Sequence, residues 1–379
     1  MVKECKEWQI NYWRLFFKLW CKRYVVNGYK MANLDEYRVL ITASGSRGIP
    51  GLISDLRLSG ERFFIVTVDI NEDAIGNLFA DKSYVVPAWD DSSYITSILE
   101  IVEKEDIKYL IPNDGFEGLV KLCQLKKHNN KLRIAVTRSQ EHLSIAVDKS
   151  KLYNFLLSNK MGNYVPSFSL VEDKDTLLSK IKDFGYPNED VAIKPSLSEG
   201  SRGFNVVREC DKNIFEEREI NSFLSLDELE FYLKRINKIP KMLVMEYLPG
   251  EEYSVDVLMS ENGKIEYIVP RVREQISNGL SIRGVVKKNL EIEEMVVSIL
   301  HVLPLEYAIN IQIKYSKDRK PKIIEINPRV SGSMTFCTGA GVNMHYYLIL
   351  LLADKLLPKV DLIYGTRMQR YYKEIYLHA

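Results

Sequence analysis

Short apolar runs alternate with helical patterns over the first third of the chain. Four of these runs predict buried strands, at 38–43, 63–69, 108–112 and 132–136. Between them, apolar residues recur at helical spacing, most clearly over 92–105. Strands that alternate with helices are typical of a parallel, Rossmann-like sheet, which binds ligands beyond the carboxyl ends of its strands. We therefore expect an α/β domain in this part of the chain.

A glycine-rich turn at 44–48 follows the first expected strand, and Asp69 ends the second. This arrangement resembles a dinucleotide site, but the turn lacks the full G-x-G-x-x-G spacing. A tight turn that leads into a helix explains the glycines better, so an NAD-dependent oxidoreductase is a poor alternative. The turn and residues 113–115, which follow the third strand, are candidates to bind part of a substrate.

From Asp148 onward the pattern combines helices with antiparallel strand pairs, as in an α+β fold. Helices are expected at 149–160, 227–236, 290–303 and 344–352. Strands are expected on both sides of a loop within 191–207, within 241–259, at 264–274 and 281–288, and in a hairpin formed by 308–315 and 320–328.

The expected hairpin carries polar side chains that alternate with isoleucines. Gln312 lies on one strand and faces Glu325 and Asn327 on the other, if the register pairs them. Residues two apart on a strand share a face, so Arg329 extends the same surface. Carboxylate and amide oxygens are hard ligands that suit Mg²⁺. A half-buried polar hairpin is the alternative, but it leaves the polar face without a purpose.

The loop between two expected strands is small, polar and rich in glycine. It contains Ser198, Gly200, Ser201 and Gly203, and Lys194 ends the strand before it. Glycines let the backbone approach a phosphate closely, and a neighbouring lysine is a natural phosphate contact. A P-loop is excluded because it needs a helix after the loop. For this loop alone, a hairpin tip with a surface lysine is an equally good explanation.

A third motif links two buried strands between Glu246 and Glu252. Backbone groups of Glu246, Tyr247 and Leu248 at such an edge can hydrogen-bond an adenine ring. Glu252 can accept hydrogen bonds from ribose hydroxyls. A turn with solvated acids is the alternative, and it is the better explanation for this segment alone.

Composition and charge exclude several functional classes. A chain of 379 residues is long enough for two or three domains, and its net charge of +1 argues against a nucleic-acid partner. The five cysteines and five histidines are scattered without metal-ligand or C-x-x-C spacing. Neither a disulfide framework nor a zinc site is expected, and a reducing cytoplasm is the expected location.

Residues 1–30 differ from the rest, because aromatic residues at helical spacing are interrupted by basic ones. The segment is too short to span a bilayer and lacks the core of a signal peptide. It is either an amphipathic helix that lies on a membrane or partner, or an extension upstream of a natural start at Met31. We prefer the second interpretation and expect no membrane contact.

The three motifs together resemble the ATP-grasp superfamily in their order and spacing, from about Tyr37 to the end. The carbamoyl-phosphate-synthetase-like branch of carboxylate–amine ligases is the most similar. The resemblance implies a Rossmann-like pre-ATP-grasp domain at 31–147. An ATP-grasp fold of two α+β subdomains would follow, at 148–250 and 251–379.

The resemblance also implies a role for each matched residue. ATP would be bound by Lys149, Lys194, Ser198, Gly200, Ser201, Gly203, Glu246, Tyr247, Leu248 and Glu252. Mg²⁺, with Mn²⁺ as an alternative, would be held by Gln312, Glu325 and Asn327. Arg329 would stabilise the transferring phosphoryl group, and residues 331–333 would border the acceptor carboxylate. Arg271, Arg273 and Arg283 are candidates to hold the carboxylate or the γ-phosphate, although surface charge is the preferred explanation for Arg271.

One position departs from the family pattern. Carbamoyl-phosphate synthetase has an arginine that helps to phosphorylate bicarbonate where this chain has Gly332. We therefore expect a larger organic carboxylate, which forms an acyl phosphate and then reacts with an amine to release ADP and phosphate. The alternatives are an ATP-binding module without turnover, a subunit of a larger synthetase, or a kinase that stops at the phosphorylated product. Homodimers are common among the similar proteins.

Overall fold

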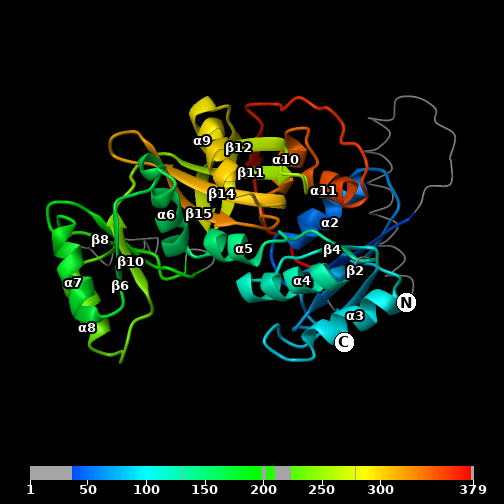
Figure 1. The fold of residues 1–379 in the computed structure, drawn as a ribbon, viewed down its shortest axis with the longest axis horizontal. Helices are drawn as coiled ribbons and strands as arrows, with labels where there is room; N and C mark the ends of the chain where they lie inside the picture. The colour runs from blue at the N-terminus through cyan, green and yellow to red at the C-terminus, as the bar shows by residue number, and fades with distance from the viewer. Residues whose placement is uncertain (1–35, 130, 199–201, 210–222, 278, 377–379) are drawn as a thin grey trace. The chain divides into compact units, whose positions relative to one another are not determined.

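The computed structural model describes residues 36–129, 131–198, 202–209, 223–277 and 279–376. The proposed N-terminal extension, residues 1–30, lies outside this part of the chain. The described strands form three sheets, and Figure 1 shows them with the helices that cover them.

The first sheet is parallel throughout. Its strand order is β3 (Lys82–Val85), β2 (Phe63–Asp69), β1 (Tyr37–Ile41), β4 (Tyr109–Ile111) and β5 (Arg133–Ile134). The four strands expected from the apolar runs are confirmed. The edge strand β3 is not among them, because its side chains are mostly exposed and form no apolar run.

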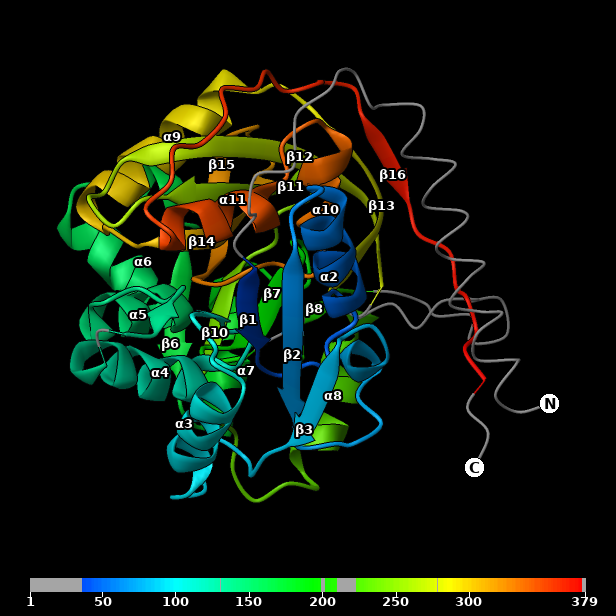
Figure 2. The ribbon, with the colours of Figure 1, turned by 90° about the vertical axis from the view of Figure 1, so that its right-hand side faces the viewer.

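Helices cover both faces of the first sheet, because its central strands are apolar on both sides. Ile41 packs with α2 (Ile49–Leu58), whereas Leu40 packs with α3 (Tyr94–Lys104) and α4 (Phe116–His128). Figure 2 shows these helices on opposite sides of β1 and β2. The alternation follows from the two-residue period of a strand. It holds the turn after β1 at the carboxyl edge of a packed sheet.

The second sheet is mainly antiparallel, and only its β8–β9 pair is parallel. Its strand order is β6 (Phe168–Val171), β10 (Met242–Glu246), β7 (Val191–Pro195), β8 (Asn205–Val207) and β9 (Phe223–Leu224). One face is buried by α7 (Lys174–Asp183) and α8 (Leu226–Leu233). The other face carries a small apolar cluster that includes Ala192 and Leu248, and Ile324 of the third sheet packs against it. The strand–loop–strand expected around Lys194 is confirmed.

The third sheet is antiparallel. Its order is β15 (Pro321–Asn327), β14 (Tyr307–Tyr315), β11 (Glu252–Met259), β12 (Ile265–Ser277), β13 (Leu280–Val286) and β16 (Arg367–Gln369). The hairpin predicted at 308–328 corresponds to β14 and β15.

Two sets of helices pack on the third sheet. On one face lie α6 (Lys149–Ser158) and α9 (Leu290–Val302), and on the other α10 (Thr335–Gly339) and α11 (Met344–Leu352). The remaining short elements are α5 (Gln140–Val147), η1 (Ile75–Leu78) and η2 (Gly162–Tyr164). Among the helices of the described residues, none has the length and apolar character of a membrane-spanning segment.

The turn after β1 touches the loop after β15 through two glycines. A Cβ atom added to Gly48 would lie 2.6 Å from the Cα atom of Gly332. The backbone of Gly48 has φ −83° and ψ −20°, which any L-residue can adopt. The close approach, and not the dihedral angles, therefore requires glycine at position 48.

We predict that Gly48→Ala lowers the free energy of unfolding by about 1–3 kcal/mol, because the added methyl group overpacks a backbone contact. Gly339→Ala is the control, since its Cβ would meet only Thr366 Cγ2, at 3.7 Å. That variant should change stability by less than about 1 kcal/mol. Denaturant unfolding of the two variants measures the difference, and equal stabilities would contradict the predicted backbone contact.

Candidate active site

Two buried lysines and a partly buried carboxylate meet where the second and third sheets face each other. Lys149 begins α6 and is 3% exposed, and Lys194 on β7 is 4% exposed. The Nζ atom of Lys149 lies 3.5 Å from Oε2 of Glu325 on β15 and donates to the carbonyl oxygen of Ser198 at 2.9 Å. The structure thus brings together Lys194 and Glu325, which were predicted from separate motifs, and Lys149, which the ATP-grasp resemblance implied.

Asp148 explains the position of Lys149. Its carboxylate caps α6 by accepting from the backbone N–H groups of Ser150 and Lys151, at 2.9 and 3.2 Å. It also accepts from the hydroxyl of Ser196, which follows β7. The cap therefore joins the start of the helix to the strand that carries Lys194.

Lys194 is held by two oxygen acceptors and not by a direct ion pair. Its Nζ donates to the hydroxyl of Tyr153 at 3.1 Å and to the carbonyl oxygen of Ile324 at 3.3 Å. Burial, with the like charge of Lys149, lowers the pKa of Lys194 to about 7, although Glu325 and Glu252 oppose this shift. An anion placed beside Lys194 would therefore strongly stabilise the protonated form of its side chain.

Glu325 stays ionised despite its burial. Burial alone would raise its pKa, but Lys149, a hydrogen bond from Asn327 and then Lys194 together lower it below its usual value. The Nδ2 atom of Asn327 donates to Oε1 of Glu325 at 3.0 Å. The carboxylate is therefore available as a negatively charged ligand.

The hairpin register confirms the predicted pairing of Gln312 with Glu325 but not its pairing with Asn327. Gln312 lies directly opposite Glu325, and Asn310 lies opposite Asn327. The amide oxygen of Gln312 accepts from Arg273 at 3.1 Å. The described residues contain no cluster of three His, Cys, Asp or Glu side chains. The donors here are instead one carboxylate and two amides, and these oxygens fit Mg²⁺, which takes its remaining ligands from water and phosphates.

Arg273 links two of the predicted ligands. Its Nη1 atom donates to Glu252 at 2.7 Å as well as to Gln312, and its Nη2 atom donates to the Gly279 carbonyl oxygen at 2.6 Å. Lys314 lies 3.7 Å from the other oxygen of Glu252. The carboxylate predicted to bind ribose is thus fixed by two cations on neighbouring strands.

Arg271 is not a surface charge, as its sequence context suggested. It is 1% exposed, and its Nε atom donates to the buried Asp256 carboxylate at 2.7 Å. Asp256 also accepts from the Asn310 amide at 2.7 Å and from the Ser331 hydroxyl at 2.8 Å. The expectation of a surface charge was wrong because the sequence pattern around Arg271 does not show that a carboxylate lies beside it on the neighbouring strand. This ion pair holds the loop that follows β15.

The predicted adenine segment borders an apolar cluster. Glu246 ends β10, and its side chain accepts from the Ser167 backbone N–H at 2.7 Å. Leu248 packs with Met245, Ala192 and Ile324 between the two sheets. The Tyr247 ring lies 5.7 Å from the Lys314 ammonium. An apolar cluster beside the end of β10 suits a flat aromatic ring.

The glycine loop is described only in part. Ser198 accepts from Lys149, and Gly203 has φ +72°, which favours glycine. Gly200 and Ser201 lie outside the described residues.

The two predicted catalytic arginines differ in position. Arg329 follows β15, is half-buried, and donates to the Val330 carbonyl oxygen at 3.1 Å. Arg283 is exposed on β13 and pairs with Glu274 at 3.2 Å, so its charge is directed to a surface partner and not to the buried cluster.

The edge of the first sheet contributes a buried carboxyl group. Asp114 accepts from the Tyr94 hydroxyl at 2.8 Å and from the Thr42 hydroxyl. Burial raises the pKa of Asp114, although these two hydroxyls and the charge of Arg329 oppose the shift. In contrast, Asp69 accepts from the backbone N–H of Gly45 at 2.7 Å and so stabilises the turn. This contact agrees with the structural interpretation of the glycine-rich turn.

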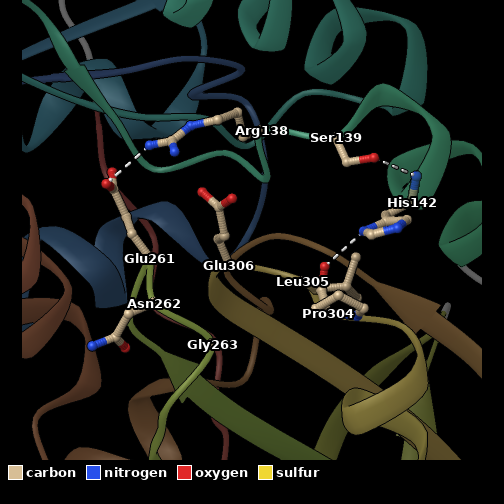
Figure 3. Close-up of a pocket in the computed structure, with 9 residues that line it drawn as sticks. All are labelled: Arg138, Ser139, His142, Glu261, Asn262, Gly263, Pro304, Leu305 and Glu306. Carbon is tan, nitrogen blue, oxygen red and sulfur yellow. Dashed lines mark hydrogen bonds and ion pairs between the residues drawn. The ribbon is translucent and has the colours of Figure 1, made fainter.

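Figure 3 shows a cavity that is separate from these residues. Its volume is about 440 Å³, and it is lined by Arg138, Ser139, His142, Glu261, Asn262, Gly263, Pro304, Leu305 and Glu306. It lies beyond the end of β11 opposite to Glu252. Arg138 and Glu261 pair at 3.0 Å, and His142 Nδ1 lies 2.9 Å from the Pro304 carbonyl oxygen. Its polar groups thus partly satisfy one another, and the predicted chemistry lies elsewhere.

Two family descriptions match the chain. Residues 238–373 match the family described as ATP-grasp in the biosynthetic pathway with Ter operon, and residues 39–137 match the PylC-like N-terminal domain. The first match contains the hairpin with Gln312 and Glu325. A comparison with curated protein sequences finds no match.

Several solved structures share the fold. N5-carboxyaminoimidazole synthetase from Staphylococcus aureus, complexed with ADP, has a TM-score of 0.65 and 16% identity, over 89% of this chain and 83% of that chain. A biotin carboxylase–β-γ-ATP complex from Campylobacter jejuni has a TM-score of 0.61 and 17% identity, over 85% and 72%. L-amino acid ligase from Bacillus licheniformis has a TM-score of 0.59 and 16% identity, over 83% and 74%. At these identities the likeness concerns the fold, and it confirms the predicted fold class.

The lowered pKa of Lys194 predicts a pH dependence of stability. In the unfolded chain this lysine keeps its proton up to about pH 10.5, whereas in the folded protein it loses the proton near pH 7. The unfolded state therefore binds more protons between these values, and the contribution of Lys194 to the free energy of unfolding rises with pH. Relative to wild type, Lys194→Met should be most stable near pH 7 and lose this advantage toward pH 10.

Denaturant unfolding at several pH values measures this effect. Lys287→Met is the control, because Glu251 raises the pKa of Lys287 and its difference from wild type should stay flat from about pH 7 to pH 9. A flat difference for Lys194→Met as well would contradict the predicted titration.

The Arg271–Asp256 pair predicts a large effect on stability. Arg271→Met leaves a buried carboxylate without its cation, which should cost about 3–5 kcal/mol of unfolding free energy. The exposed Arg283 offers a matched control on the same sheet, where Arg283→Met should cost less than about 1 kcal/mol. Denaturant midpoints of the two variants give the comparison, and a similar small cost at both positions would refute the buried pair.

Proposed function

We propose that this chain, which carries an ATP-grasp domain behind a PylC-like N-terminal domain, is an ATP-dependent ligase that joins an organic carboxylate to an amine. ATP is the phosphoryl donor, and the products are an amide, ADP and phosphate. The observation that carries the proposal is the buried group of Lys149, Lys194 and Glu325. These residues place two cations and a metal-binding carboxylate in one space between two sheets.

The two lysines suit the phosphates of a nucleotide. Their charges are only partly balanced, since Glu325 is the one carboxylate that pairs directly with either of them among the described residues. An incoming phosphate chain would offset the burial and the like charge of Lys149, which lower the pKa of Lys194. Lys194 would then be protonated in the complex and would act as a fixed positive charge.

Gln312, Glu325 and Asn327 would hold Mg²⁺. When bound, the ion would neutralise part of the phosphate charge. The carboxylate of Glu325 supplies the negative charge at this position, and Asn327 orients it through the 3.0 Å hydrogen bond. Arg273 holds the Gln312 amide so that its oxygen keeps a defined direction.

In the proposed reaction a substrate carboxylate oxygen attacks the γ-phosphorus atom, and the bond to the ADP oxygen breaks. The amine then attacks the acyl carbon, phosphate leaves, and the amine nitrogen loses a proton. These steps need positioning and charge stabilisation and no covalent protein nucleophile. Arg329 has no ion pair among the described residues and is free to stabilise the transferring group. The neighbouring loop of Ser331 and Gly332 would border the carboxylate.

The proposal is tested by measuring ADP release from MgATP. Mixtures of amino acids and other small carboxylates are scanned with and without amines. ADP that forms only when both a carboxylate and an amine are present supports a ligase. ADP with a carboxylate alone supports a kinase, and nucleotide binding without ADP from any mixture contradicts the proposed activity.

We predict that Glu325→Gln lowers kcat by about 10²–10³-fold or more, because it removes the charge that would hold the metal at the transferring phosphoryl group. Nucleotide binding should weaken less, since both lysines remain. Glu291→Gln is the control, because Glu291 is an exposed carboxylate on α9 that accepts from Tyr315 at 2.9 Å. Turnover by Glu325→Gln at the control rate would show that the metal assignment is wrong.

A further inference from the structure

Arg370 is a half-buried cation directly after β16, and no motif in the sequence identifies it. Its backbone N–H donates to the Ile282 carbonyl oxygen at 2.8 Å, which fixes it beside β13. Its Nε atom donates to the Ser281 carbonyl oxygen at 3.1 Å and its Nη2 atom to the Gly332 carbonyl oxygen at 2.5 Å. The guanidinium group therefore lies against the loop that borders the predicted carboxylate site.

The charge of Arg370 is not balanced by the protein. Among the described residues no carboxylate forms an ion pair with it, and the charged neighbour that acts on it most is another cation, Arg271. Arg271 already has its own partner in Asp256. Burial and the charge of Arg271 both lower the pKa of Arg370. Arg271 thus has a carboxylate partner, whereas Arg370 has none among the described residues.

Some of the N–H donors of Arg370 have no described acceptor. A guanidinium group carries five N–H donors, and two of the nitrogen atoms of Arg370 have described acceptors. In the described part of the chain, the one fully buried side-chain N or O atom that lacks a partner is Oε1 of Glu293. The Nη1 atom of Arg370, which has no described acceptor, is therefore not fully buried.

The position of Arg370 distinguishes it from the nucleotide-binding lysines. Those lysines contact β15 at Ile324 and Glu325, whereas Arg370 contacts the following loop at Gly332. The reacting centre proposed above, at Asn327 and Arg329, lies between these two points along the chain. An anion at Arg370 would therefore belong to the acid substrate and not to the triphosphate.

We propose that Arg370, with Arg271 behind it, binds a second anionic group of the acid substrate, separate from the carboxylate that is phosphorylated. The substrate is then a dicarboxylic acid or an acid that carries a phosphate, since either group accepts the paired N–H donors of an arginine. This inference rests on the proposed ligase function. It makes Arg370 a specificity-determining residue.

The first experiment measures ADP release by the full chain with matched acids. Monocarboxylates, dicarboxylates of similar length and phosphorylated hydroxy acids are compared in the presence of amines. Wild type should prefer one of the two dianionic classes, which identifies the source of the second charge. Arg370→Gln should raise KM for that acid by about tenfold or more and leave KM for ATP within about twofold, and Arg370→Lys should fall between.

Arg367→Gln is the matched control. Arg367 lies on β16, is exposed, and pairs with Glu274 at 2.7 Å, so its loss should leave both KM values unchanged. Melting temperatures of all three variants show whether they fold. Equal KM values for the acid in Arg370→Gln and Arg367→Gln would overturn the proposal.

The second experiment measures anion binding without turnover. Succinate, glutarate and inorganic phosphate are titrated into MgADP-saturated protein, and the rise in melting temperature is followed. Wild type and Arg367→Gln should be stabilised at concentrations about tenfold below those needed for Arg370→Gln. Identical curves, or no stabilisation of wild type by any of the anions, would overturn the subsite. Stabilisation that depends on Arg370 without any ADP release would instead leave the subsite standing and reject the ligase.

Discussion

Lys149, Lys194 and Glu325 place two buried ammonium groups beside one partly buried carboxylate, and the contacts around them hold these charges in position. Each residue comes from a different element, α6, β7 and β15. The cap of Asp148 on α6 and the hydrogen bond from Tyr153 to the Ile324 carbonyl oxygen, at 3.0 Å, hold these elements together. Burying two like charges close together costs free energy. The contacts that join the sheets hold the two lysines in this arrangement, so a phosphate chain that binds there would be stabilised.

A second set of charged residues holds the neighbouring site residues in position. Arg273 fixes Gln312 and Glu252, and the buried pair of Arg271 and Asp256 fixes the loop at Ser331. This set lies within the third sheet, where neighbouring antiparallel strands bring long side chains into register. The first sheet reaches the same loop through Gly48. The proposed phosphate, metal and acid positions therefore follow one another along β15 and the loop after it.

The sequence predicted most of the site because alternation on a strand carries over directly to a shared face. The alternating isoleucines of the hairpin assign Gln312 and Glu325 to polar faces of their strands, and the register of the structure pairs them. Arg271 could not be placed, because its burial depends on Asp256, fifteen residues away on another strand. Arg370 was missed because its proposed role depends on its contacts with Ser281 and Gly332, which are distant in the sequence, and its own segment contains no motif. Tyr153 could have been found, since it lies one helical turn after Lys149 on the same face of α6.

The distances along the chain between the contacting residues have a consequence for how the protein acquires its site. Tyr153 and Lys194 reach Ile324 across 171 and 130 residues. Such contacts close large loops, so they form late, after the individual sheets have collapsed. Substitutions among the buried charges should therefore act mainly on the rate of unfolding and leave the rate of folding almost unchanged. Selection can then alter the chemistry of this site with little effect on whether a newly made chain folds.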